Sequence, residues 1–426
     1  MKKRYKILIL FAVAAIFGGV IGEGFGVMEK NPDYDLFLQA LAGVIGVALG
    51  YFLAVALNKP KTKNEYTFTV FCALCVSGTI IAIKKFVQFF ADFYLGSDLV
   101  HCHTVEDDHW LFRVFGFGMS PYEQRPLLDT DEDFAVSIIF SLLATAVLYL
   151  YLRFKNKDAF SKEKREFVFS VRRIPENIKS KVALEIEKMK NDCSIWDFIL
   201  WWGTRAVMLY AFIVMENRAE ATLLFANFVG TFAITLVHFI LPRTSALAKV
   251  SYKTQTLITI IVFLGSWCGN YVGVYNITPR FDLFLHFISG YLCVMGGYYI
   301  ALTLIKPENK KQIFLVTFFA FCFSFFIIPF WEVSEFVGDF IWGTDNQGFY
   351  WGPSDESFFF KVFGHGIGNT KLYYLFDTVY DMLLAAVTTV LTFIGLCLGL
   401  NLKTTKKKAY IDKNKKCDEE NVIIHC

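Results

Sequence analysis

Charged residues are scarce in this chain, and their scarcity excludes an ordinary soluble domain. Only 19% of the 426 residues are charged, whereas 55% are hydrophobic and 18% are aromatic. Soluble domains carry about 25% charged residues. The formal net charge is only +3 and comes from basic segments that flank apolar runs, so no nucleic-acid partner is expected.

Familiar chemical motifs are absent as well. The ten cysteines lie mostly within or beside apolar runs, and their spacing is not that of a disulfide framework. The sequence contains no Ser-His phosphatase motif, no phosphate-binding glycine loop and no His-Glu-x-x-His zinc motif. The chain therefore has to be interpreted from its pattern of apolar and ionisable residues.

Long apolar runs dominate that pattern. A helix needs about 20 apolar residues to cross a bilayer. Ten runs of this kind occur, at about 5–27, 35–57, 66–92, 132–153, 196–215, 219–241, 254–274, 282–305, 313–341 and 378–401. They predict an all-α polytopic protein of the cell membrane with ten transmembrane helices. The first run has a basic start but no small-residue cleavage site, which favours a helix over a signal peptide.

Basic residues flank the runs on alternate sides. They gather at residues 2–4, 59–63, 153–190, 243–253, 306–311 and 403–408, whereas acidic runs occur in the opposite loops at 106–108 and 355–356. Loops rich in lysine and arginine stay in the cytoplasm. Both termini are therefore expected to be cytoplasmic.

A sequence segment near the start of the chain recurs 247 residues later. Residues 32–60 align without gaps to 279–307 with 13 identities, and 92–98 match 339–345 at the same offset. The second repeat then has one additional residue, so that the offset becomes 248. At this offset, residues 113–118 match 361–366 and residues 128–133 match 376–381. Four matches in order predict two parallel four-helix repeats, related by an axis along the membrane normal.

The repeats divide the chain into four expected parts. These are a degenerate four-span repeat (1–154), a basic cytoplasmic linker (155–194), a six-span membrane unit (195–402) and a disordered cytoplasmic tail (403–426). In the linker, apolar residues from Ile174 to Met189 recur at helical spacing, which is typical of an amphipathic helix on an anionic leaflet. A solvated linker helix is an equal alternative. Membrane lipids are the expected partners.

Ionisable residues inside the last spans are the main functional signal, because charge is costly in a bilayer and usually marks function or a structural pair. On three helices they fall at spacings of three, four or seven, so each set shares a helix face. The predicted orientation brings them to one level of the outer leaflet. They are Asp282, His286, Glu332, Glu335, Asp339, Asp377 and Asp381.

A divalent cation is the leading explanation for this set. Several carboxylates with one imidazole suit Mg²⁺, Mn²⁺ or Zn²⁺. The predicted ligands are Asp282, His286, Asp339, Asp377 and Asp381, and the predicted catalytic residues are Glu332 and Glu335. The expected function is a metal-dependent membrane hydrolase or transferase for a lipid or lipid-linked substrate.

The first repeat serves as an internal comparison. Its matching residues are Asp35, Gln39, Lys85, Gln88, Asp92, Asp129 and Asp133. Glutamine replaces the histidine and lysine replaces one glutamate, as expected where a cation has been lost. Alternatives remain: an ion- or proton-coupled transporter, a non-catalytic scaffold with a structural polar network, and helix capping by Asp282 and Asp377. His101-Cys102-His103 is a further candidate for a metal, and His365 for an acid or base.

Three motifs carry a family resemblance. Asp282-x-x-x-His286-Phe287-x-x-Gly290, Trp331-Glu332-x-x-Glu335 and Asp377-Thr378-x-x-Asp381-Met382 resemble the YjdF-like family of six-span bacterial inner-membrane proteins over residues 195–402. The Asp-x-x-x-His-Phe phrase is also similar to one in VanZ-like membrane proteins. The resemblance implies a fold unit and important positions, and no reaction. The additional repeat in front departs from the family pattern.

Overall fold

Helices make up nearly all of the structure. The computed structural model describes residues 33–95, 125–161, 174–216, 218–232, 235–236, 252–278, 280–342, 378–379 and 381–400. No strand occurs within these ranges. Seven of the described helices are long and apolar enough to cross a membrane by length and composition. The predicted all-α polytopic architecture is confirmed, while the predicted span at 5–27 lies outside the described residues.

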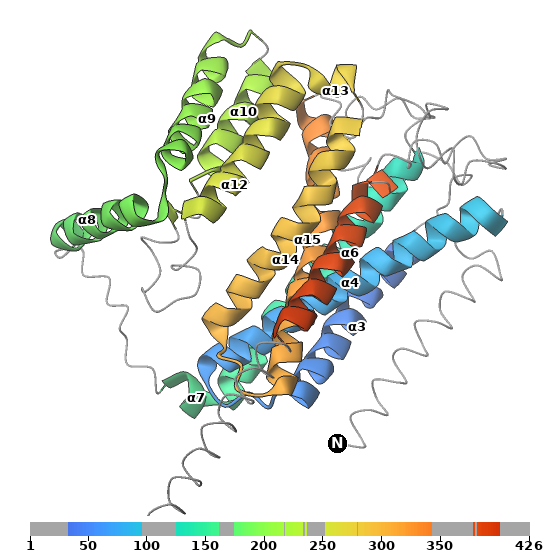
Figure 1. The fold of residues 1–426 in the computed structure, drawn as a ribbon. Coiled ribbons are helices and arrows are strands. Elements are labelled where there is room, and N and C mark those ends of the chain that lie inside the picture. Colours follow the sequence, from blue (N-terminus) through green and yellow to red (C-terminus); the bar gives the residue numbers. More distant parts are fainter. Residues whose placement is uncertain are drawn as a thin grey trace, which may run out of the picture.

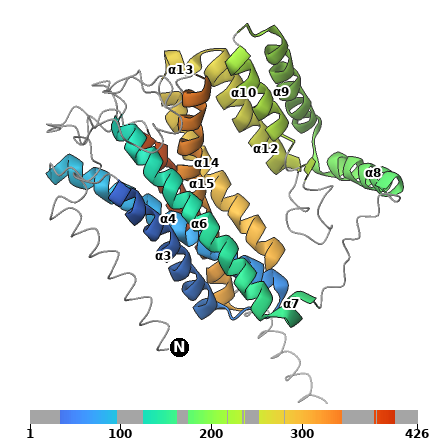
Figure 2. The same ribbon diagram turned by 180° about the vertical axis from the view of Figure 1, so that it is seen from behind.

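Two groups of long helices form the centre of the molecule (Figures 1 and 2). The N-terminal bundle consists of α3 (Asp33–Leu57), α4 (Lys63–Leu95) and α6 (Arg125–Lys155). The C-terminal bundle consists of α14 (Arg280–Leu304), α15 (Lys310–Trp342) and a C-terminal helix (Asp381–Leu400). Helices α4 and α15 pack against each other and join the two bundles. Aromatic rings meet there, with Phe68 and Phe319 5.1 Å apart between centroids.

The two bundles have matching helix bounds. Helices α3 and α14 both have 25 residues, and α4 and α15 both have 33. Helix α14 begins and ends 247 residues after α3, and α15 begins and ends 247 residues after α4. The sequence offset of 247 thus applies to whole helices.

Helix contacts within the bundles also match. The Ser77 hydroxyl donates to the carbonyl of Gly43 at 2.9 Å and pairs with the Ser141 hydroxyl at 2.9 Å. The Ser324 hydroxyl donates to the carbonyl of Gly290 at 3.4 Å and pairs with the Thr389 hydroxyl at 2.7 Å. Such hydroxyl pairs satisfy polar groups between buried helix faces.

Glycine permits the close helix approach at these contacts. A Cβ atom on Gly43 would collide with the carbonyl oxygen of Ser137, and one on Gly290 would collide with that of Ala385. Small residues at such crossings let helix backbones meet in membrane proteins. The same packing device therefore occurs in both bundles.

A third group of helices stands beside the C-terminal bundle (Figure 1). It contains α9 (Ile195–Val214), α10 (Arg218–Gly230), α12 (Tyr252–Phe263) and the π-helical segment η3 (Leu264–Tyr271), and the short helix α13 (Val274–Ile277) leads from it to α14. Ser194 begins α9 through a capping box, since its hydroxyl accepts from the Asp197 N–H at 3.2 Å and its own N–H donates to the Asp197 carboxylate at 2.9 Å.

The chain departs from the predicted continuous span at 219–241. Helix α10 ends at Gly230, and residues 231–232 form a turn. Arg205 of α9 lies at this turn, where one guanidinium nitrogen donates to the carbonyl of Thr231 at 2.7 Å and another donates to that of Trp201 at 2.8 Å. A break is tolerated at membrane depth where other groups bond the freed backbone. The predicted span at 254–274 is helical but changes to π-helix from Leu264.

The predicted linker helix is present as α8 (Ile174–Asp192), preceding the short gap to α9. Figures 1 and 2 show it lying crosswise to α9. Its Glu185 carboxylate accepts a hydrogen bond from the Tyr252 hydroxyl at 2.7 Å, which attaches α8 to the beginning of α12. Val182 and Ile186 are exposed. The short helix α7 (Lys157–Ser161) follows α6.

Candidate functional site

Three helices of the C-terminal bundle meet at the site. Asp282 lies in the first turn of α14 and His286 lies one turn later, so both side chains project from the same face. Glu332 and Glu335 lie one turn apart on α15, and Asp381 lies at the beginning of the C-terminal helix. Because α14 and the C-terminal helix begin where α15 approaches its end, all three helices bring these groups to one end of the bundle.

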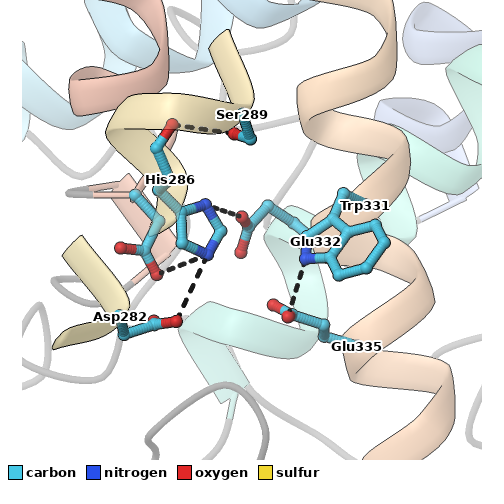
Figure 3. Close-up of polar contacts among 7 residues, drawn as sticks. Asp282, His286, Ser289, Trp331, Glu332 and Glu335 are labelled. Atoms are coloured by element: carbon cyan, nitrogen blue, oxygen red, sulfur yellow. Dashed lines mark hydrogen bonds and ion pairs between the residues drawn. The ribbon is translucent and has the colours of Figure 1, made fainter. Parts of the chain in front are cut away.

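His286 occupies the centre of the group (Figure 3). Its Nε2 atom is 3.7 Å from Asp282 Oδ1 and 3.6 Å from Asp381 Oδ2, and its Nδ1 atom is 3.9 Å from Glu332 Oε1. The side chains of Glu332 and Asp381 are 1% and 2% exposed, while that of Asp282 is 24% exposed. Each ring nitrogen therefore faces carboxylate oxygen in a largely buried setting.

Glu335 belongs to the same group through a different contact. Its carboxylate accepts a hydrogen bond of 2.7 Å from the indole N–H of Trp331, one turn earlier on α15 (Figure 3). Trp331 is half exposed, as are the neighbouring apolar side chains of Phe330 and Phe284. The buried polar group thus adjoins an apolar surface of α14 and α15.

The distances around His286 are longer than direct hydrogen bonds. Hydrogen bonds from N–H to oxygen span about 2.7–3.2 Å, and all three His286 contacts are longer. Two ligand atoms about 2.1 Å from one ion are about 3.0 Å apart at an octahedral angle and about 3.4 Å apart at a tetrahedral one. One ligand atom from each of Asp282, His286 and Asp381 lies within 4.8 Å of the others, as in the set His286, Glu332 and Glu335. The donor set fits a divalent cation.

The N-terminal bundle places different groups at the matching positions. Gln39 Nε2 donates to Asp133 Oδ2 at 2.7 Å, and Lys84 Nζ donates to Gln39 Oε1 at 2.7 Å. Lys85 forms an ion pair with the same oxygen of Asp133, and the two side chains are 4% and 3% exposed. Direct contacts of hydrogen-bond length close this cluster, whereas the contacts around His286 are about one ångström longer.

Two predicted ligands cannot be placed in the site. Asp339 lies in α15 near its end, but its side chain is outside the described part, and Asp377 lies wholly outside the described residues. The candidates His101-Cys102-His103 and His365 also fall outside the described ranges. The other five predicted residues come together as described above.

Two polar residues were missed by the sequence interpretation. Lys84 contacts Gln39, although only its neighbour Lys85 aligned with an ionisable residue of the second repeat. Arg205 is 2% exposed in the middle of α9, and its guanidinium carbon lies 3.6 Å from the ring centroid of Trp201 and 4.5 Å from that of Phe232. A charged residue inside the apolar run 196–215 was the available signal for it.

The fold and the apolar helices define the class: the chain is a multi-pass, all-α membrane protein, and such a protein is in contact with lipid. In comparison with known families, residues 198–400 match the model of a predicted membrane protein family, DUF2238. The match covers the third group of helices and the C-terminal bundle, including His286, Glu332 and Asp381. No curated protein and no solved structure matches the chain.

Proposed function

We propose that the protein is a metal-dependent enzyme of the cell membrane that acts on a lipid or lipid-linked substrate. The observation that carries the proposal is the position of His286, whose two ring nitrogens face three carboxylates at 3.6–3.9 Å. Asp282, His286 and Asp381 are the ligands at the Nε2 side, together with Asp339 and Asp377 of the sequence prediction. A divalent cation bound there would polarise a phosphoryl or carbonyl oxygen of the substrate.

The carboxylates at the other side of the ring have separate roles. Glu332, whose Oε1 lies 3.9 Å from His286 Nδ1, would orient the ring once the metal is bound, as carboxylates near metal-bound histidines commonly do. Glu335, whose carboxylate accepts the Trp331 indole N–H, is the proposed general base for the attacking nucleophile. Glu332 is the second candidate for that role.

A lipid substrate is supported by the surroundings of the site. Phe284 and Phe287 on α14 and Phe330 and Trp331 on α15 are all exposed apolar side chains beside the polar group. Exposed apolar surface of a membrane helix faces acyl chains, so a substrate with a lipid tail can reach the site from the bilayer. The basic flanking loops support a site on the outer side, with both termini cytoplasmic.

We infer that the two bundles arose by duplication. The equal lengths of α3 and α14 and of α4 and α15, their offset of 247 and the paired Ser77 and Ser324 contacts support this inference. Under this inference, the C-terminal bundle retains the proposed metal site and the N-terminal bundle has a structural role. The resemblance to YjdF-like proteins over residues 195–402 agrees with the C-terminal assignment and stays a prediction.

Metal analysis of the purified protein tests the proposal. After loading with Mg²⁺, Mn²⁺ or Zn²⁺ and removal of free ion, the wild type should retain metal and Asp381→Asn should lose it. Asp133→Asn is the matched control, because it changes the equivalent aspartate of the other bundle and should leave metal content unchanged. Turnover of a panel of phospholipids and lipid-linked phosphates should follow metal content. A loaded wild type without activity on any lipid would remove the enzyme proposal.

An ion-coupled transporter is the second candidate, favoured by one observation. Helix α10 stops at Gly230 beside Arg205, and α12 carries the buried polar residues Gln255, Thr256 and Thr259. Interrupted helices with buried polar groups are typical of transporter binding sites. Ion uptake into proteoliposomes that depends on Arg205 and His286, without lipid turnover, would favour this candidate over the enzyme.

A further inference from the structure

The N-terminal bundle contains a cation supplied by the chain itself. The Lys85 ammonium forms a buried ion pair with Asp133, and Gln39 donates to the same carboxylate oxygen at 2.7 Å. A buried ammonium is stable only beside such acceptors, because desolvation penalises an unpaired charge. The cluster is therefore held by a covalently attached positive charge.

The C-terminal bundle has carboxylates at both matching positions. Glu332 stands 247 residues after Lys85, and Asp381 stands 248 residues after Asp133. Both are buried, and both face His286, the counterpart of Gln39. The exchange of Lys85 for Glu332 removes one positive charge and adds one negative charge at a buried position. Two carboxylates in low dielectric favour a bound cation.

Contact lengths support the same conclusion. The pair Gln39 Nε2 and Asp133 Oδ2 is 2.7 Å apart, whereas the matching pair His286 Nε2 and Asp381 Oδ2 is 3.6 Å apart. The longer contact is close to the separation of two ligands that share one ion. The additional space therefore lies between His286 and Asp381. Asp381 is the counterpart of Asp133, which accepts the Lys85 ammonium in the N-terminal bundle.

From these contacts we propose that the C-terminal bundle binds its divalent cation where the N-terminal bundle holds the Lys85 ammonium, with Asp381 and His286 Nε2 as principal ligands. This proposal rests on the metal site of the proposed function and adds its location. It further assigns the N-terminal bundle as a permanently neutralised form of the same site. A lysine at position 332 should then replace the metal ion.

The test compares wild type, Glu332→Lys and Glu332→Gln in detergent, by metal content and by thermal midpoint with and without a chelator. Wild type should bind metal. Its thermal midpoint should fall by about 3 °C when the metal is removed by the chelator, if the ion was present at about 100 times its dissociation constant. Glu332→Lys should bind no metal, and the chelator should not change its midpoint. Glu332→Gln should still bind metal, about 10–100-fold more weakly, as for loss of a carboxylate behind a ligating histidine.

A reciprocal variant covers the case in which Glu332→Lys does not fold. The double change Gln39→His with Lys85→Glu should add a second bound metal ion per chain and make the N-terminal bundle sensitive to chelation. Metal binding by Glu332→Lys at the wild-type level, or no additional metal in the folded double variant, would overturn the proposal. Either result leaves the enzyme proposal standing if wild type binds metal and turns over lipid, so the two failures are distinguishable.

Discussion

The buried ion pair of the N-terminal bundle gives a quantitative prediction. Replacing Lys85 by Met keeps a long apolar side chain and leaves Asp133 without its ammonium partner. The two side chains are only 4% and 3% exposed. Removing one partner of a buried ion pair costs about 3–5 kcal/mol. We expect Lys85→Met to lose about 3 kcal/mol of unfolding free energy, the lower end of this range, because the Gln39 amide still donates to Asp133 at 2.7 Å.

The expected shift in the thermal midpoint follows from chain length. An unfolding entropy of about 2.1 cal/mol/K per residue gives about 0.9 kcal/mol/K for 426 residues. A loss of about 3 kcal/mol therefore lowers the midpoint by about 3 °C. Thermal unfolding in detergent, followed by intrinsic tryptophan fluorescence, measures it.

A double-mutant cycle separates the ion pair from simple packing. Lys85→Met with Asp133→Asn removes both charges, so the double variant should be more stable than the sum of the two single changes predicts. Lys84→Met is the matched control. It should lower the free energy of unfolding by less than Lys85→Met, because Lys84 is only partly buried. Strict additivity of the two single changes, or no loss in Lys85→Met, would refute the reasoning.

Three further predictions concern other contacts. Gly290→Ala should destabilise the protein by about 1–3 kcal/mol through collision with the Ala385 carbonyl, whereas Gly203→Ala, which meets no neighbouring atom, should be neutral or stabilising in thermal unfolding. Arg205→Leu should lower the midpoint more than Arg205→Lys, because the leucine leaves the Thr231 carbonyl without its donor; equal midpoints would contradict this. Trp331→Phe should reduce lipid turnover and leave metal content unchanged, since it removes only the hydrogen bond to Glu335; loss of metal would contradict the assignment of Glu335.

Much of the helical architecture could be predicted because a bilayer imposes length and composition. The runs at 35–57 and 313–341 became α3 and α15 with bounds within a few residues of the prediction. Backbone groups must bond within the helix at membrane depth, so a long apolar run leaves few alternatives. The same constraint applies to each bundle separately.

The gathering of the site residues was also accessible from spacing. Asp282 and His286 are four residues apart and Glu332 and Glu335 are three apart, so helix geometry alone places each pair on one face. The predicted orientation then gave them a common depth, and the structure brings them together with Asp381. Their roles as ligands and catalytic groups stay predictions.

Other features depend on contacts between distant segments and could not be predicted. The end of α10 at Gly230 occurs inside the apolar run 219–241, and it is accompanied by a donor from Arg205, 26 residues from its acceptor Thr231. The change to π-helix at Leu264 falls in a segment with Gly265 and Gly269, but helical periodicity does not distinguish this segment from a continued α-helix. The contact of Lys84 with Gln39 depends on how α3 and α4 pack, which helix periodicity within one segment does not specify.

The most direct test of the central claim is the metal content of wild type and His286→Gln, which introduces the residue found at the matching position of the N-terminal bundle. After loading with Mg²⁺, Mn²⁺ or Zn²⁺, the wild type should contain bound metal and be stabilised by it. His286→Gln should contain far less, with the midpoint of the chelated wild type. A wild type that binds none of the three ions, with both proteins equally stable, would contradict the account.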